Sequence, residues 1–111
     1  MISLTKTAIK VLIIVSLKTK ETEKIEKIIS KYPNTWLLTD PKSADLLAKS
    51  NVLSHISPER IIVFNGRKPE ELALKIYSTV APDIVYLCDE RGSLKPILDF
   101  MTRAPVDVIE C

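Results

Sequence analysis

Residues 8–17 read AIKVLIIVSL, and this nearly unbroken apolar run, rich in β-branched side chains, decides the fold. A short continuous run of this kind is typical of a parallel strand that is covered on both faces. It is too short to cross a membrane, contains Lys10, and is followed by Lys18 with no small-residue cleavage site, so a signal sequence is not indicated. The run therefore predicts a buried strand near the start of an α/β fold.

Strands and helices alternate along the rest of the chain. Short apolar runs predict further strands at residues 35–39, 60–65, 83–88 and 106–110. Amphipathic patterns, two of them opened by proline, predict helices at residues 21–32, 41–50, 69–80 and 93–101. Because this alternation requires right-handed parallel crossovers, residues 1–111 are predicted to form a single α/β domain with a three-layer, doubly wound, five-stranded parallel sheet.

Two strand orders fit this pattern. The first, third and fourth strands look buried, whereas the second and fifth are short with polar ends, which favours the order 2-1-3-4-5 with strands 2 and 5 at the edges. This order resembles that of flavodoxin-like folds, a resemblance that rests on element order alone and carries no motif. The helix count favours the alternative order, 3-2-1-4-5, because four helices then cover both faces evenly. We give strand burial more weight.

The preferred order has a consequence for partners. The sequence predicts four helices and no fifth, so in the order 2-1-3-4-5 one face of the sheet is covered by a single helix. A monomer rarely tolerates the apolar surface that such a face exposes, and a second subunit would cover it. We therefore expect a homo-oligomer, most simply a dimer, or an unknown protein partner.

Composition sets the expected environment. The 111 residues carry a net charge of +2, with 46% hydrophobic and 27% charged residues, and the two signs are interspersed. This gives no specific signal for nucleic acid or for a membrane surface. The absence of Gln, the three Asn and the heavy use of Lys, Glu, Ile and Leu are typical of proteins from thermophiles. We expect a cytoplasmic protein without a cofactor.

The loop after the first strand excludes several function classes. Residues 16–20 contain no glycine, so the chain has neither a dinucleotide-binding fingerprint nor a P-loop there. The same loop has no carboxylate, whereas receiver domains, haloacid-dehalogenase-like phosphatases, PIN-type nucleases and Toprim domains place an acid there to hold Mg²⁺. An enzyme is therefore less expected than a binding module, and we assign no catalytic residue.

Basic and small polar residues follow the first and third strands. In the order 2-1-3-4-5 these two loops meet at the switch point of the sheet, where doubly wound folds bind ligands. Cations before a helix make sense if an anion lies between them, although a tight turn with glycine at positive φ explains the second loop as well. The candidate anion-binding residues are Ser16, Lys18, Thr19, Asn65, Gly66 and Arg67.

The end of the fourth strand offers two further features. Asp89 and Glu90 are adjacent carboxylates that a metal-dependent enzyme would need, but a solvated loop neutralised by Arg91 accounts for them more simply. Cys88 and Cys111 end neighbouring strands, which makes a disulfide feasible. We favour two free thiols, because adjacent parallel strands seldom offer the required geometry, and we expect no metal site.

Three large side chains are candidates for an interface. Trp36 lies on the short second strand, Met101 belongs to the apolar stripe of the last helix, and Phe100 lies off that stripe and widens the apolar face. Aromatic and methionine side chains are enriched in interface centres, although most at such positions belong to the core. The leading hypothesis is a non-catalytic α/β module that self-associates or binds another protein, and the alternative is a domain that binds a small anionic ligand.

Overall fold

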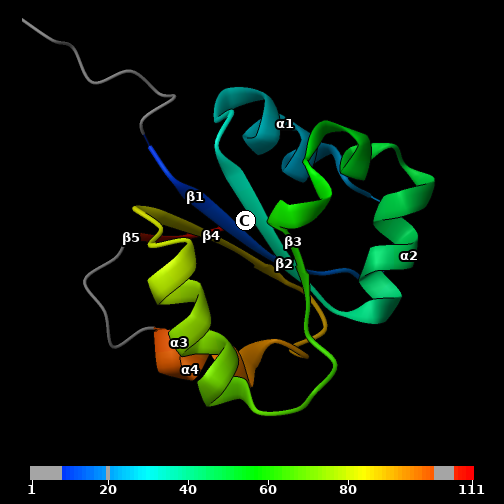
Figure 1. Ribbon diagram of the computed structural model, residues 1–111. Helices are drawn as coiled ribbons and strands as arrows, with labels where there is room; N and C mark the ends of the chain where they lie inside the picture. Colours follow the sequence, from blue (N-terminus) through cyan, green and yellow to red (C-terminus); the bar gives the residue numbers. More distant parts are fainter. Residues whose placement is uncertain (1–8, 20, 102–106) are drawn as a thin grey trace, which may run out of the picture.

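A computed structural model of the chain contains one parallel sheet in the strand order β3-β2-β1-β4-β5, with helices on both faces (Figure 1). It describes residues 9–19, 21–101 and 107–111, apart from the side chain of residue 101. The strands are β1 (Val11–Ser16), β2 (Thr35–Thr39), β3 (Ile61–Val63), β4 (Ile84–Asp89) and β5 (Asp107–Glu110). The helices are α1 (Glu23–Lys31), α2 (Pro41–Lys49), α3 (Pro69–Thr79) and α4 (Lys95–Met101), with the 3-10 turns η2 (Val52–His55) and η3 (Pro58–Arg60). The predicted fold class is confirmed.

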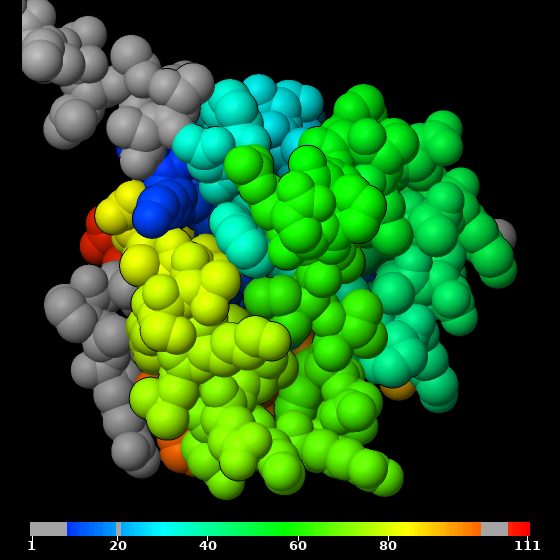
Figure 2. Space-filling view, in the orientation of Figure 1, coloured from blue at the N-terminus to red at the C-terminus, as the bar shows by residue number. Residues whose placement is uncertain are grey.

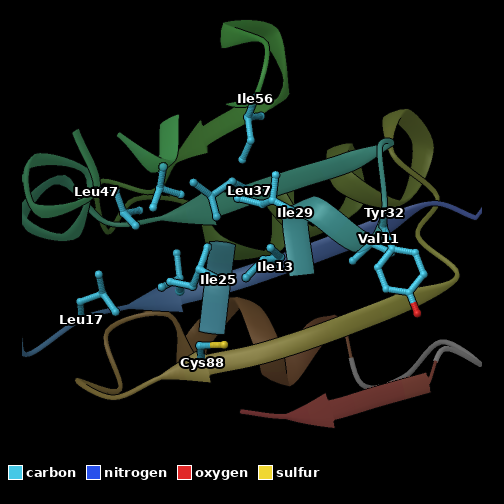
Figure 3. Close-up of a cluster of buried hydrophobic side chains, with 12 residues drawn as sticks. Val11, Ile13, Leu17, Ile25, Ile29, Tyr32, Leu37, Leu47, Ile56 and Cys88 are labelled. Carbon is cyan, nitrogen blue, oxygen red and sulfur yellow. The ribbon is translucent and has the colours of Figure 1, made fainter. Parts of the chain in front are cut away.

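Strand β1 is the centre of the sheet, as its apolar run predicts. It pairs with β2 on one side and β4 on the other, and all six of its residues are buried. Because successive side chains point to opposite faces, Ile13 and Val15 join the core under α1, while Leu12 and Ile14 join the core on the other face. Figure 3 shows the first of these clusters, with Cys88 of β4 at its margin near β5.

The preferred strand order, 2-1-3-4-5, is wrong, and the alternative order is the one observed. Strand β3 is an edge strand of three residues, and its Val63 is 48% exposed despite the apolar sequence. Strand β2 lies inside the sheet because the polar residues at its ends are buried with satisfied hydroxyls: Thr35 donates to the carbonyl of Tyr32, and Thr39 to that of Val15. Polar strand ends therefore do not mark an edge when their hydrogen bonds are satisfied inside the protein.

The helices are divided evenly between the two faces. Ile25 of α1 and Leu47 of α2 are buried on one face, and Ile76 of α3 and Ile97 of α4 are buried on the other. The side chains of α3 and of the segment with η2 and η3 fill much of the face seen in Figure 2. The premise that one face holds a single helix is therefore wrong, and it no longer supports a partner.

Most expected boundaries differ little from those observed, but the third strand, predicted at residues 60–65, is only Ile61–Val63. Strand β4 begins and ends one residue later than predicted, and α1 is shorter at both ends. Ala8 and Val106, which were predicted to begin the first and last strands, lie outside the described residues. Within the described ranges, no helix is both long and apolar enough to span a membrane.

Two of the three interface candidates contribute to the core. Trp36 and Phe100 are partly buried and pack against the apolar cluster on the α3 side of the sheet. The side chain of Met101 lies outside the described part of the structure. The packing of Trp36 and Phe100 matches the more common role of such residues, which is to fill the core.

Helix α3 offers a matched test of this core. Ile76→Ala removes a fully buried side chain and should lower the free energy of unfolding by about 3–4 kcal/mol, through lost apolar burial and a residual cavity. Leu74→Ala, on the same helix but 69% exposed, should change it by less than about 0.5 kcal/mol. Urea denaturation followed by the fluorescence of the single tryptophan measures both, and equal losses would contradict the assigned packing.

Candidate functional site

The switch point of the sheet lies between β1 and β4. From β1 the chain adds β2 and then β3 on one side, and it then crosses to the other side of β1 to add β4 and β5. The loops after these two strands are joined by backbone contacts. The backbone N–H of Glu90 donates to the carbonyl of Ser16 at 2.8 Å, and the N–H of Lys18 donates to Oε1 of Glu90 at 2.9 Å. The carboxyl ends of β1 and β4 therefore form one rigid corner.

A buried carboxylate, Asp40, connects this corner to β2. Its Oδ2 accepts hydrogen bonds from the hydroxyl of Ser16 at 2.9 Å and from that of Ser93 at 2.6 Å. Its Oδ1 accepts the backbone N–H of Ser43 at 2.7 Å, which caps α2. The Ser43 hydroxyl in turn accepts the N–H of Leu17 at 2.8 Å. We call Ser16, Asp40, Ser43 and Ser93 the Asp40 network.

The Asp40 network holds a negative charge inside the protein. Burial, which leaves Asp40 only 6% exposed, is the largest single influence and opposes ionisation. The hydrogen bonds from Ser93, from the backbone and side chain of Ser43 and from Ser16 together outweigh it, so the pKa lies below the usual 3.8. Arg91 adds an ion pair, with Nη1 3.8 Å from Oδ1. Asp40 therefore contacts the loop after β4 through both Ser93 and Arg91.

The predicted anion-binding residues do not come together. The loop with Asn65, Gly66 and Arg67 follows the edge strand β3, and β2 separates that strand from β1. Gly66 has φ +92°, and Oδ1 of Asn65 accepts the N–H of Arg67 at 3.1 Å, so this loop is a tight turn. Ser16 is fully buried in the Asp40 network, and Thr19 is exposed with its hydroxyl accepting from the N–H of Glu21.

A cleft of about 590 Å³ lies at the carboxyl ends of β4 and β5, beside the start of α1. We call it the acidic cleft, because its described lining holds five carboxylates and one ammonium group. The charged lining residues are Glu21, Glu23, Lys24, Asp89, Glu90 and Glu110. The remaining lining residues are Leu17, Ile25, Leu87, Cys88 and Cys111. Its volume is within the range of ordinary ligand sites.

Asp89 is the least satisfied group of this cleft. Its Oδ1 is buried and has no hydrogen-bond partner among the described residues. A buried carboxylate oxygen without a hydrogen-bond partner is costly in free energy. Glu90, its neighbour, is held by the N–H of Lys18. Within the described residues, no group of three or more His, Cys, Asp or Glu is arranged to hold a metal ion.

A second, shallower depression of about 490 Å³ lies on the other side of the loop after β1, and Leu17 lines both. Its charged residues are Lys18, Lys42, Asp45 and Arg91, which come from two loops and from α2. Of the six anion-binding candidates, Lys18 is the one that lines it. We call this surface the basic depression.

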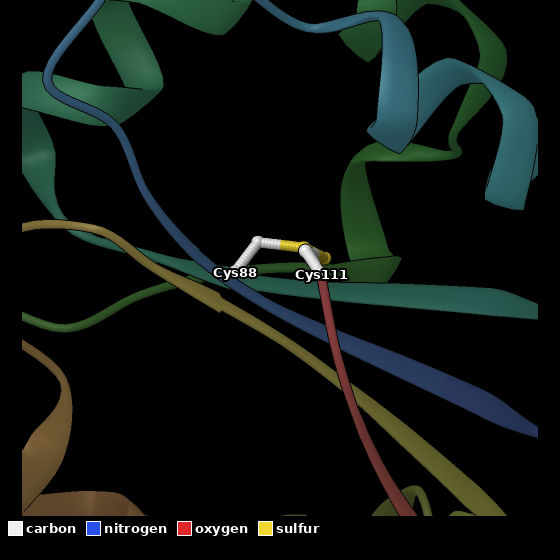
Figure 4. The surroundings of a disulfide bond; sticks show 2 residues. All are labelled: Cys88 and Cys111. Atoms are coloured by element: carbon white, nitrogen blue, oxygen red, sulfur yellow. A yellow bond between two sulfur atoms is a disulfide. The ribbon is translucent and has the colours of Figure 1, made fainter.

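Cys88 and Cys111 are joined by a disulfide, shown in Figure 4. The expectation of two free thiols is wrong: the β4–β5 register continues to the residues after Leu87 and Glu110, and brings the two Cα atoms to 5.1 Å. The bond spans 23 residues of sequence, a separation at which a cross-link stabilises a fold by about 3 kcal/mol. It forms part of the wall of the acidic cleft.

Several site residues were not found from the sequence. Glu21 and Glu23 looked like solvated residues of a surface helix, and Glu110 simply ended the last strand. Only the correct strand order brings these segments to one corner. One signal was present in the sequence: Asp40 follows the second strand and Ser93 follows the fourth, and both are polar. In the observed strand order the two residues form a hydrogen bond.

Comparisons with protein-family models, with curated proteins and with solved structures found no significant match to this chain.

The Asp40 network should control stability at acid pH. Asp40→Ala is expected to lower the free energy of unfolding by about 3 kcal/mol, because α2 loses its cap and two hydroxyls lose their acceptor. Asp40→Asn keeps an oxygen that can cap α2, so it should lower the free energy of unfolding by less than Asp40→Ala does. Since the folded pKa of Asp40 is below 3.8, its ionised form contributes stability above about pH 4 that is lost as the pH falls through the folded pKa.

The difference in unfolding free energy between wild type and Asp40→Asn should therefore be larger at about pH 6 than at about pH 2.5. Urea titrations at both pH values measure it. Asp45→Asn, an exposed change on the same helix, is the control and should show little difference at either pH. A pH-independent difference for Asp40→Asn would contradict the buried charge.

Proposed function

We propose that the protein is a non-catalytic binding module whose acidic cleft accepts a lysine- or arginine-bearing segment of a partner protein. The observation that carries this proposal is the lining of the cleft, with five carboxylates against one ammonium group beside an apolar floor. The chain as a whole is slightly basic, with a net charge of +2, so this concentration of acids is local. A local potential of this sign attracts cations to the cleft.

Asp89 supports a cationic ligand in particular. Its Oδ1 is buried without a hydrogen-bond partner among the described residues, and the residue lines the cleft. As one of the five carboxylates of the lining, it adds to the attraction that the cleft exerts on an arginine or lysine side chain. Leu17 and Ile25 offer apolar contacts for the methylene stem of such a side chain.

Strand β5 supports a polypeptide rather than a small cation. It is an edge strand of the sheet and pairs with β4 alone among the described strands. Its Val108 and Ile109 are 41% and 42% exposed, and Glu110 at its end lines the cleft. An open sheet edge accepts an extended segment through main-chain hydrogen bonds, which leaves side chains free to reach the cleft.

Calorimetric titration with a hexa-arginine peptide tests the proposal. We expect saturable binding that weakens by about tenfold or more when the salt concentration is raised to about 0.5 M, because screening removes the local attraction. Asp89→Asn should reduce the affinity at least about tenfold, because one of the five carboxylates of the cleft loses its charge, while the free energy of unfolding stays equal or rises, since its Oδ1 has no hydrogen-bond partner to lose.

Glu70→Gln, the same change of charge on α3 across the sheet, is the matched control and should leave binding unchanged. Hexa-glutamate should not bind. Spermine serves as a small cation, and binding of spermine as tight as that of the peptide would count against a protein partner. Equal affinity of wild type and Asp89→Asn for hexa-arginine would refute the proposed site.

The basic depression supports a second candidate, the binding of a small anion. Its three cationic residues, Lys18, Lys42 and Arg91, come from separate segments and gather at one corner. Such a cluster suits a phosphate group. If it binds anions, inorganic phosphate should raise the melting temperature of the wild type, and Lys42→Ala should abolish this shift. Absence of a shift at millimolar phosphate would remove this candidate.

A further inference from the structure

The Cys88–Cys111 disulfide forms part of the wall of the proposed binding site. Both cysteines line the acidic cleft, and the bond joins the carboxyl ends of β4 and β5 (Figure 4). Cys88 is 8% exposed and belongs to the core cluster, whereas Cys111 is exposed. A reductant can therefore approach the Cys111 side of the bond from solvent while the Cys88 side stays packed.

Strand β5 has little else to hold it in the sheet. All four of its residues are exposed, in contrast to the six buried residues of β1. Among the described residues, its pairing is confined to the ladder with β4 and to the hydrogen bond from the N–H of Cys111 to the carbonyl of Leu87 at 2.9 Å. Segments with few buried apolar contacts open at low free-energy cost, so the disulfide is the main constraint on this strand.

Release of β5 would dismantle one wall of the acidic cleft. Glu110 and Cys111 line the cleft from β5, and the remaining lining residues come from α1, from the loops beside it and from β4. The edge that would pair with an extended segment also belongs to β5. The state of one covalent bond therefore determines both features on which the proposed partner depends.

We propose that the Cys88–Cys111 disulfide is a redox switch that holds β5 in the sheet and thereby controls binding at the acidic cleft. The inference rests on the proposed function for its effect on binding, but not for its effect on the strand. In the oxidised state β5 stays in the sheet and forms one wall of the cleft. In the reduced state the strand is released and this wall is lost.

The co-reactant is a thiol reductant. A thiolate of a small dithiol attacks Sγ of Cys111, the S–S bond breaks, and Cys88 leaves as a thiolate that takes up a proton. The second thiol of the reagent then closes its own disulfide and releases Cys111 as a thiol. Two electrons and two protons pass from the dithiol to the protein, and a disulfide oxidant reverses the reaction.

Hydrogen–deuterium exchange of the whole chain, before and after dithiothreitol, tests the switch. We expect the amides of residues 107–111 to exchange about tenfold faster or more after reduction, while those of β1 are unchanged. Reoxidation with diamide should restore the slow exchange. Cys111→Ser should exchange rapidly without reductant and should not respond to dithiothreitol, which separates the bond from other effects of the reagent.

Two results would overturn the inference. One is equal protection of residues 107–111 in the oxidised and reduced states. The other is alkylation of both cysteines, under denaturing conditions without reductant, in protein already treated with diamide, since no bond would then form. If β5 is released, hexa-arginine should bind the oxidised form at least about tenfold more tightly than the reduced form.

The binding measurements separate this inference from the proposed function. If β5 is released on reduction and neither form binds hexa-arginine, the proposed function fails while the switch of the strand stands. If the two forms bind the peptide equally, the cleft retains its function and its control by the disulfide is refuted. Release together with a loss of affinity supports both.

Discussion

The carboxylate of Asp40 connects the elements on which the rest of the structure depends. Its two oxygens receive hydrogen bonds from the end of β1, from the first turn of α2 and from the loop after β4. Three segments far apart in the sequence are thereby fixed at one corner of the sheet. A buried charge is tolerated only with such donors. The network also reaches Leu17, whose N–H donates to the hydroxyl of Ser43 and which lines both the acidic cleft and the basic depression.

The cleft follows from how the helices are distributed. Helices α1 and α2 accompany the crossovers among β1, β2 and β3, while α3 and α4 cover the opposite face. Among the described residues, no further helix packs over β4 and β5 on the α1 side of the sheet. The acidic cleft lies there, between α1 and the ends of these strands. A ligand site at this place agrees with the general preference of doubly wound sheets for the switch point.

Local patterns predicted the elements well, and the apolar run of β1 identified the central strand. The strand order was misjudged because burial was inferred from composition: Ile61, Ile62 and Val63 are apolar yet form an edge, whereas Thr39 is polar yet fully buried. The candidate site depended on that order, so Asp89, Glu90 and the cysteines were noticed while Glu21 and Glu23 were not. Contacts between distant segments leave no local signal in one sequence.

We propose above that the acidic cleft, with Asp89 in its lining and β5 at its edge, binds a cationic segment. The most direct test is a two-dimensional amide NMR titration of the oxidised, isotope-labelled protein with hexa-arginine. We predict saturable shifts confined to the amides after β1, at the start of α1, around the end of β4 and along β5. Shifts that are absent, or that are spread over α2 and α3 as much as over the cleft, would contradict it.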